Sequence, residues 1–260
     1  MMSRMTVAGV AALAIMAALG PASAQEKFVA RYGEARTILA FKVSDAALQK
    51  VLPEGWQSSP IGAGPSKDAN LTVSFIDWLA VQGPDGKSED TLFLAAVGAP
   101  VKKKGTDATV AMVITGFSSK SSYVPGAYGT FTLGKANVER NVRTDAEGVS
   151  KAEESWEFKG DGGASIALQV QYVRSLPTRG KLEAKIYSSV KPDFYRIYRI
   201  EQAVDVVRSV PAGTDHAQKY VFKASGPQFS QLFDASEQLI SITSLPWYSR
   251  EVFLPDQRTQ

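Results

Sequence analysis

The sequence predicts a mainly β fold, an antiparallel β-barrel that is closed or nearly closed and carries a few short helices. Apolar and polar residues alternate with a period of two along most of the chain, which is typical of strands with one buried face. Turn-forming residues separate these runs roughly every 8 to 15 residues. So many strands need protected edges, and closure of the sheet protects them. Because no linker or repeat interrupts the pattern, we expect one domain over residues 25–260.

The first strand and the first helix are predicted together. The segment RTILAFKV at 36–43 alternates as a strand does. Ser44 follows it and has the side chain of an N-cap for a short helix over 45–52. Pro53 cannot continue a helix, and Gly55 favours a turn behind it.

Further strands follow at regular spacing. The segment at 108–117 is apolar on both faces, which suits a central strand, and the turn DAEG at 145–148 joins two alternating runs into a hairpin. The other predicted strands lie at 70–81, 90–97, 164–174, 181–188, 194–208 and 217–224. The segment PQFSQLFDASEQL predicts the only other helix, over 227–239.

The N-terminal residues have the pattern of a secretory signal peptide. Arg4 provides a positive start, residues 7–19 form an apolar run, and Ala22-Ser23-Ala24 has the small residues of a cleavage site. The apolar run is shorter than the ~20 residues of a membrane-spanning helix. We therefore predict cleavage after Ala24, a periplasmic or secreted mature chain, and no membrane association after the signal is removed.

Composition excludes several classes of function. The chain contains no cysteine and one histidine, so it has no disulfides, thiolate metal site or cysteine nucleophile, and we predict neither a metal nor a cofactor. Removal of Arg4 with the signal lowers the formal charge from +3 to +2, which is too weak to suggest nucleic acid as a partner. His216 lies in a segment with the composition of a loop, so a serine-histidine-aspartate triad through it is not favoured.

Four charged residues share a strand face with apolar neighbours. Strand alternation places Asp77, Glu154, Arg174 and Arg196 on faces that are otherwise apolar. A buried charge is costly unless it is paired, so these residues are candidates for a polar cavity inside the barrel. Exposure at strand ends, or structural pairing with one another, remains the alternative for each.

Lys135 is ambiguous by the same test. The apolar positions change phase at Gly134, a natural place for a β-bulge that aims a side chain either into a cavity or out of it. Asn137, Glu139 and Arg143 continue the face of Lys135 as a polar stripe. That stripe favours a solvated lysine over a buried amine nucleophile.

Two long segments resemble the acetoacetate decarboxylase superfamily. RTILAFKVSDAALQKVLPEGW at 36–56 is similar to its strand, short helix and proline turn, and SGPQFSQLFDASEQLISITSLPWYSREVFLP at 225–255 is similar to its C-terminal block. A weaker likeness covers QYVRSLPTRGKLEA at 171–184. The resemblance implies a cone-like antiparallel β-barrel that binds a small keto acid in its interior, and it makes a homo-oligomer plausible.

The same resemblance implies a lysine that forms a Schiff base, but the chain departs from that motif. Where the family has an aromatic residue, proline and two lysines, this sequence has Tyr128-Gly129-Thr130-Phe131. The leading hypothesis is therefore an acetoacetate decarboxylase-like barrel that binds a small carbonyl or carboxylate compound without that lysine. Arg36, Arg174 and Arg196 are the candidate carboxylate-binding residues.

The remaining candidates are assigned roles in the same hypothesis. Tyr128 and Thr130 are candidate hydroxyl donors, while Asp77 and Glu154 are candidates for general acid or base catalysis. One alternative is an active Schiff-base lyase, a decarboxylase or aldolase-type enzyme, that uses Lys135. A second alternative is a non-enzymatic carrier of an apolar ligand.

Overall fold

The computed structural model describes residues 26–255. The predicted signal segment and its cleavage site lie outside the described residues.

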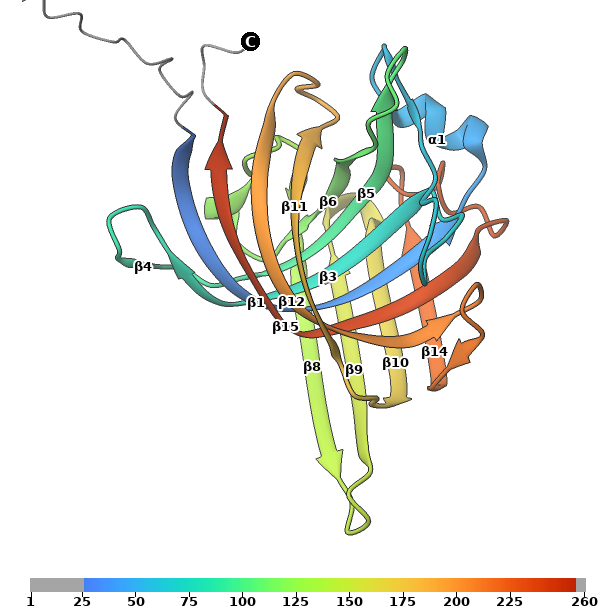
Figure 1. Ribbon diagram of the computed structural model, residues 1–260. Helices are drawn as coiled ribbons and strands as arrows, with labels where there is room; N and C mark the ends of the chain where they lie inside the picture. Colours follow the sequence, from blue (N-terminus) through green and yellow to red (C-terminus); the bar gives the residue numbers. More distant parts are fainter. Residues whose placement is uncertain (1–25, 256–260) are drawn as a thin grey trace, which may run out of the picture.

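Two β-sheets make up most of the structure (Figure 1). The larger sheet contains β1 (Lys27–Lys42), β2 (Trp56–Ser58), β3 (Leu71–Gln82), β4 (Ser88–Glu89), β5 (Phe93–Lys103), β6 (Val110–Ser118), β7 (Phe131–Leu133), β11 (Thr178–Ser188), β12 (Tyr195–Ser209), β13 (Thr214–Asp215) and β15 (Gln238–Leu254). The smaller sheet contains β8 (Lys135–Thr144), β9 (Ser150–Lys159), β10 (Ser165–Val173) and β14 (Ala217–Ser225). The described helices are α1 (Asp45–Val51) and the 3-10 turns Ser121–Tyr123 and Asp161–Gly163.

Seven strands of the larger sheet close into a ring. Their order is β5-β3-β1-β15-β12-β11-β6, and β6 pairs with β5 to complete it. All neighbours in the ring are antiparallel except β6 and β11, which run parallel over three residue pairs. The predicted fold class, mainly β and largely antiparallel with few short helices, is confirmed.

The two faces of the larger sheet have different roles. Its inner face carries one apolar cluster, which includes Ile76, Tyr128 and Val252. Its outer face carries a second cluster, in which Phe75 packs against Trp156 of the smaller sheet. Figure 1 shows β1, β3, β12 and β15 curving together, with the smaller sheet on their convex side. The inner face of the larger sheet therefore encloses the interior of the ring, and its outer face packs against the smaller sheet.

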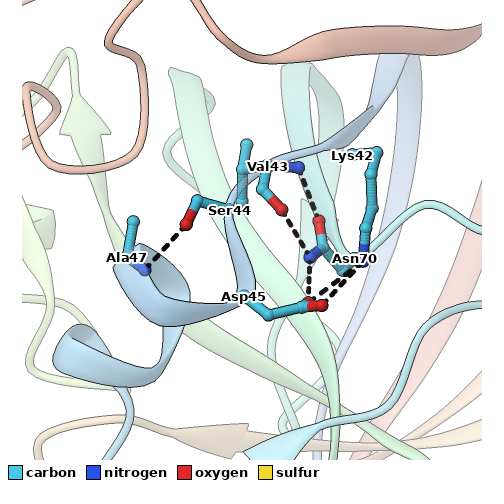
Figure 2. A network of polar contacts seen from close by, with 6 residues as sticks. All are labelled: Lys42, Val43, Ser44, Asp45, Ala47 and Asn70. Carbon is cyan, nitrogen blue, oxygen red and sulfur yellow. Dashed lines mark hydrogen bonds and ion pairs between the residues drawn. The ribbon is translucent and has the colours of Figure 1, made fainter.

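Helix α1 begins where the sequence predicts. Ser44 caps it, because the Ser44 hydroxyl accepts a hydrogen bond from the amide of Ala47 at 3.4 Å. Asn70 fixes the preceding turn by accepting from the Val43 amide at 2.8 Å and donating to the Val43 carbonyl at 2.9 Å. Figure 2 shows that Asp45 joins this network through Asn70 and Lys42. The Lys42 contact is the main reason that the pKa of Asp45 is lowered.

The predicted helix at 227–239 is wrong. Residues 227–232 form consecutive turns, and β15 begins at Gln238. The amide of Phe229 bonds to Gly226, and that of Phe233 bonds to Phe229, so the turns do not extend into a regular helix. Phe229, Leu232 and Phe233 are buried. Tertiary burial of these side chains fixes the segment, while Asp234 accepts from the Ser236 amide and ends it.

Candidate functional site: a cavity inside the strand ring

A cavity of about 660 Å³ lies against the inner face of the ring. Its polar end is formed by side chains from β1, β12 and β15, together with Tyr128 from the segment before β7. Strand alternation turns alternate residues of β5 and β6 inward, so their apolar side chains line the rest. The lining therefore combines an apolar wall with one charged end, which is the usual composition of a small-molecule site.

The charged end is built on Glu34. The side chain of Glu34 is fully buried, and each of its two carboxylate oxygens accepts from a different arginine. Arg250 donates from Nε to Oε1 at 2.8 Å, and Arg36 donates from Nε to Oε2 at 2.6 Å. One carboxylate thus holds two guanidinium groups at the cavity wall, and the three side chains together carry one net positive charge.

Aromatic rings hold the two arginines in place. The Cζ atom of Arg36 lies 3.7 Å from the ring centroid of Tyr248. The Cζ atom of Arg250 lies 4.2 Å from the ring centroid of Tyr32 and 4.4 Å from that of Tyr198. Guanidinium groups stack favourably on such rings. The stacking leaves the edges of the guanidinium planes to serve as hydrogen-bond donors.

Arg250 has unused donors. Within residues 26–255 its only side-chain hydrogen bond runs from Nε to Glu34, so its two terminal nitrogens have no protein partner. Burial opposes the charge on Arg250, but Glu34 together with Tyr198, Tyr248 and Tyr32 outweighs this effect and holds the pKa of Arg250 well above its ordinary value. The residue is therefore a fixed cation with free N–H groups beside the cavity, suited to a carboxylate.

Two tyrosines near the arginines, Tyr128 and Tyr248, have raised pKa values. Tyr128 and Tyr198 share a hydrogen bond of 2.7 Å between their hydroxyl groups. Burial, followed by the proximity of Tyr198, raises the pKa of Tyr128 well above its usual value. Burial also raises the pKa of Tyr248, although Arg36 opposes the rise. At neutral pH the hydroxyl groups of Tyr128 and Tyr248 are therefore protonated, and that of Tyr128 donates to Tyr198.

The five binding residues that the sequence predicted do not all lie in one site. Arg36 and Tyr128 line the cavity. Thr130 is buried, its hydroxyl has no partner among the described residues, and it does not line the cavity. Arg196 lines a separate cleft of about 430 Å³ beside Tyr32 and Tyr123. Arg174 follows β10, and its amide bonds to the Ser150 carbonyl.

Asp77 and Glu154 lie together, but on the opposite face of the larger sheet from the cavity. Arg140 of β8 lies between them, 3.5 Å from an oxygen of Asp77 and 3.6 Å from an oxygen of Glu154. Glu154 accepts hydrogen bonds from the side chains of Thr37, Trp156 and Tyr172 at 2.6, 2.9 and 3.1 Å. Burial raises the pKa of Asp77, and Arg140 limits the rise. This cluster fills the space between the two sheets.

Two lysines are relevant to amine chemistry. Lys135 is exposed at the start of β8, an edge strand of the smaller sheet, and is not part of the cavity lining. Lys185 of β11 borders the cavity, but it is exposed and its Nζ lies 5.5 Å from the ring centroid of Tyr195. Its strand neighbours Ala184 and Ile186 pack into the inner cluster, so the Lys185 side chain leaves from the other face.

The described part of the chain contains neither a buried histidine nor a group of side chains that could hold a metal ion. His216 is exposed between β13 and β14. Across residues 26–255, no three histidine or carboxylate side chains are grouped to hold a metal ion. The helices of this same range are all too short or too polar to span a membrane.

Sequence reasoning missed Glu34 and Arg250, although the sequence contained a signal for both. Arg250 alternates with the apolar residues Tyr248 and Val252, and Glu34 alternates with Tyr32. The period-two test that selected Asp77 and Glu154 therefore applies equally to these two residues. Extension of the first predicted strand, which actually begins at Lys27, would have included Glu34.

Comparison with solved structures agrees with this architecture. The enzyme MppR of enduracididine biosynthesis, complexed with a condensation product of pyruvate and imidazole 4-carboxaldehyde, matches with a TM-score of 0.53 at 11% identity, over 92% of this chain and 94% of that one. An acetoacetate decarboxylase-like enzyme from Sphingomonas wittichii RW1 matches with a TM-score of 0.52 at 11% identity, over 92% and 98% of the two chains. No family model matches the sequence, and no curated protein matches it.

The chain therefore has the acetoacetate decarboxylase-like fold, as the resemblance of residues 36–56 and 225–255 predicted. At 11% identity this likeness establishes the fold and leaves the chemistry to the residues of the site.

Proposed function

We propose that the chain binds a carboxylate compound, such as a keto acid, in the cavity inside the ring, without a Schiff-base lysine. One observation carries the proposal: Arg250 is a buried cation whose terminal nitrogens have no protein partner in the described chain and which borders a cavity of about 660 Å³. A ligand carboxylate supplies the acceptors that those donors lack. Arg36 reinforces the positive charge from the other side of Glu34.

The lysines near the cavity and at the start of β8 are poorly placed for a Schiff base. A nucleophilic lysine needs a neutral amine, which requires burial or a neighbouring cation. Lys135 and Lys185 are both exposed, so neither has the desolvated surroundings that favour a neutral amine. The exposed position of Lys135 therefore favours ligand binding over the lyase alternative.

A binding titration with Arg250→Met tests this function. We expect acetoacetate or a longer keto acid to bind the wild-type protein and to lose at least tenfold in affinity in the variant, because charged hydrogen bonds contribute about 1.5–3 kcal/mol. Calorimetry measures the affinity, and circular dichroism checks that the variant is folded. Lys185→Met is the matched control at the cavity border, with unchanged affinity expected. Equal binding by Arg250→Met and the wild type would refute the carboxylate site.

Reduction with borohydride tests the exclusion of a Schiff base. Mass spectrometry of the protein treated with keto acids and borohydride is expected to detect no reduced adduct on any lysine. An adduct that forms on the wild type would restore the lyase alternative, and peptide mapping would identify the lysine.

We also propose that the chain is exported and begins at Gln25 in its mature form. The support is the positive start, apolar run and Ala22-Ser23-Ala24 cleavage pattern of the sequence. N-terminal sequencing of the protein recovered from a bacterial periplasm tests it, and retention of Arg4 would contradict it.

A further inference from the structure

The cavity is much larger than a short keto acid. This inference rests on the proposed function, since it concerns the ligand of the same site. A water molecule takes up about 30 Å³ of liquid, so a cavity of about 660 Å³ has room for roughly twenty heavy atoms. Acetoacetate, with seven heavy atoms, would leave about two thirds of that room empty. A ligand that fills the cavity therefore has a carbon chain much longer than the four carbons of acetoacetate.

Polar and apolar groups are segregated in the cavity. The charges Glu34, Arg36 and Arg250 lie at one end with the tyrosine hydroxyl groups. The inner positions of the remaining wall are mostly apolar, and several of them are small. The exceptions are Thr72 and Ser74 of β3, and the Thr72 hydroxyl already donates to the Gly98 carbonyl at 3.2 Å. The apolar inner positions are Ile76, Leu94, Ala96, Ala111, Val113, Phe131, Ala184, Ile186 and Ile200. Such a wall binds hydrocarbon and offers few groups to a polar ligand body.

The apolar wall is also long. Arg36 is level with Ile76 of β3, which is in turn level with Leu94 of β5. The lining continues along β5 to Pro100, a distance of six strand residues and on the order of 20 Å. Beyond Pro100 the cavity is bordered by exposed Ala108 and Thr109, on the side of the molecule where the β5–β6 hairpin lies beside α1 (Figure 1). An extended chain fits between the charged end and this opening.

The net charge at the polar end of the cavity favours a ligand with one carboxylate group. Glu34 neutralises one of the two arginines, which leaves one net positive charge. Burial makes an uncompensated charge expensive, so a single ligand carboxylate balances the wall and a second one does not.

We infer that the ligand is a monocarboxylate with a long apolar body, in the chemical class of medium-chain and longer fatty acids, with the carboxylate at Arg250 and Arg36. The volume and length of the cavity fit roughly eight to fourteen carbons. The chain points along β5 and β6 toward the opening. A keto group on that chain is compatible with the site.

A chain-length series tests the inference on the full mature protein. Calorimetry or competition binding is run with straight-chain acids from butanoate to tetradecanoate, with acetoacetate, and with the primary alcohol of each length. We expect affinity to rise about fourfold per added CH₂ until the cavity is full, and then to level off. Each alcohol is expected to bind at least tenfold more weakly than its acid, and Arg250→Met is expected to remove that difference.

The failures of the two proposals are distinguishable. If acetoacetate and butanoate bind as tightly as decanoate and still depend on Arg250, the long-chain inference is refuted and the carboxylate site stands. If acids and alcohols bind equally, or no acid binds, the proposed function fails and the inference fails with it.

A variant that shortens the cavity adds a second readout. Ala111 lies opposite Pro100 on the neighbouring strand, near the opening. With Ala111→Phe, affinity is expected to stop rising at an acid several carbons shorter than in the wild type. Ala184→Leu, on β11 directly beside β6, serves if the first variant folds poorly. The control is Ala146→Phe in the exposed tip of the β8–β9 hairpin, with no change expected. An unchanged chain-length profile in both cavity variants would overturn the inference.

Discussion

The two faces of the larger sheet each hold a cluster of charged side chains, but the surroundings of the clusters differ. On the inner face, Glu34, Arg36 and Arg250 carry one net positive charge, and Arg250 keeps donors that no described residue accepts. On the outer face, Asp77 and Glu154 flank Arg140 and carry one net negative charge. Glu154 lies on β9 between the two sheets, and neutral donors from both sheets satisfy it there.

This difference shows which property of a buried charge indicates a binding site. Burial and a charge on an apolar strand face are common to both clusters, so they do not distinguish a site from a structural contact. The inner cluster differs because the unused donors of Arg250 adjoin unfilled volume, whereas the unpartnered Nε of Arg140 is buried between the two sheets. The outer cluster has its acceptors occupied, so it stabilises the contact between the sheets. Variants on the two faces are expected to separate stability from binding.

The largest effect is expected from Glu154→Ala on the outer face. The substitution leaves Thr37 and Trp156 without their acceptor and removes a partner of Arg140, while Tyr172 keeps Ser244 as an acceptor at 2.9 Å. We expect the free energy of unfolding to fall by about 3–5 kcal/mol, as when a buried ion pair loses one partner. Ligand affinity is expected to stay unchanged, because Glu154 is on the other face from the cavity. Chemical denaturation and calorimetry measure the two quantities.

Glu154→Gln is the matched control, since it retains one acceptor oxygen and the side-chain volume, and a smaller loss is expected. If Glu154→Ala weakened ligand binding while leaving stability intact, the assignment of the two faces would be reversed.

Glu34→Gln on the inner face tests the charge balance of the cavity. Loss of the negative charge leaves two positive charges at the polar end, from Arg36 and Arg250. We expect the affinity for a dicarboxylate relative to the monocarboxylate of the same length to rise at least tenfold, since like and opposite charges interact strongly at partly buried positions. Competition binding with matched acids measures the ratio. An unchanged ratio would mean that these three charges do not contact the ligand.

Strand alternation in the sequence predicts the strands well but does not predict which face of the sheet lines the cavity. Strand alternation predicted most strands and the fold class, because it depends on local sequence and a shared core. It selected Asp77 and Glu154 as facing inward, but alternation only states that residues share a face. Which face of the sheet encloses a cavity depends on ring closure between β5 and β6, a contact that strand periodicity does not encode. The helix at 227–239 failed for a related reason, since burial of Phe229 and Phe233 overrode local propensity.

A smaller effect is expected from the titration of Asp77. Burial raises its folded-state pKa above the ordinary 3.8. An acid with a raised folded-state pKa binds its proton more tightly in the folded chain, so its contribution to stability is lost as the pH rises through that pKa. The wild type is therefore expected to lose stability relative to Asp77→Asn as the pH rises from below 3.8 toward neutrality. Denaturation of both proteins across this range measures the difference. A constant difference would contradict the buried position of Asp77 beside Glu154.

The smallest effect is expected from Lys135→Ala, which lies in neither cluster. Lys135 is exposed on the edge strand β8 and is directly opposite Lys159 on β9. Like charges that face each other across two strands repel, and Glu157 already pairs with Lys159 at 2.8 Å. We therefore expect a change in unfolding free energy within about 0.5 kcal/mol, toward stabilisation, and unchanged ligand affinity. Denaturation at low and high salt measures the first quantity, with the gain shrinking as salt screens the repulsion. A reduced keto-acid adduct that disappears in Lys135→Ala would contradict this account, because a solvated ammonium opposite another cation on an edge strand has no means of reaching the cavity on the inner face of the ring.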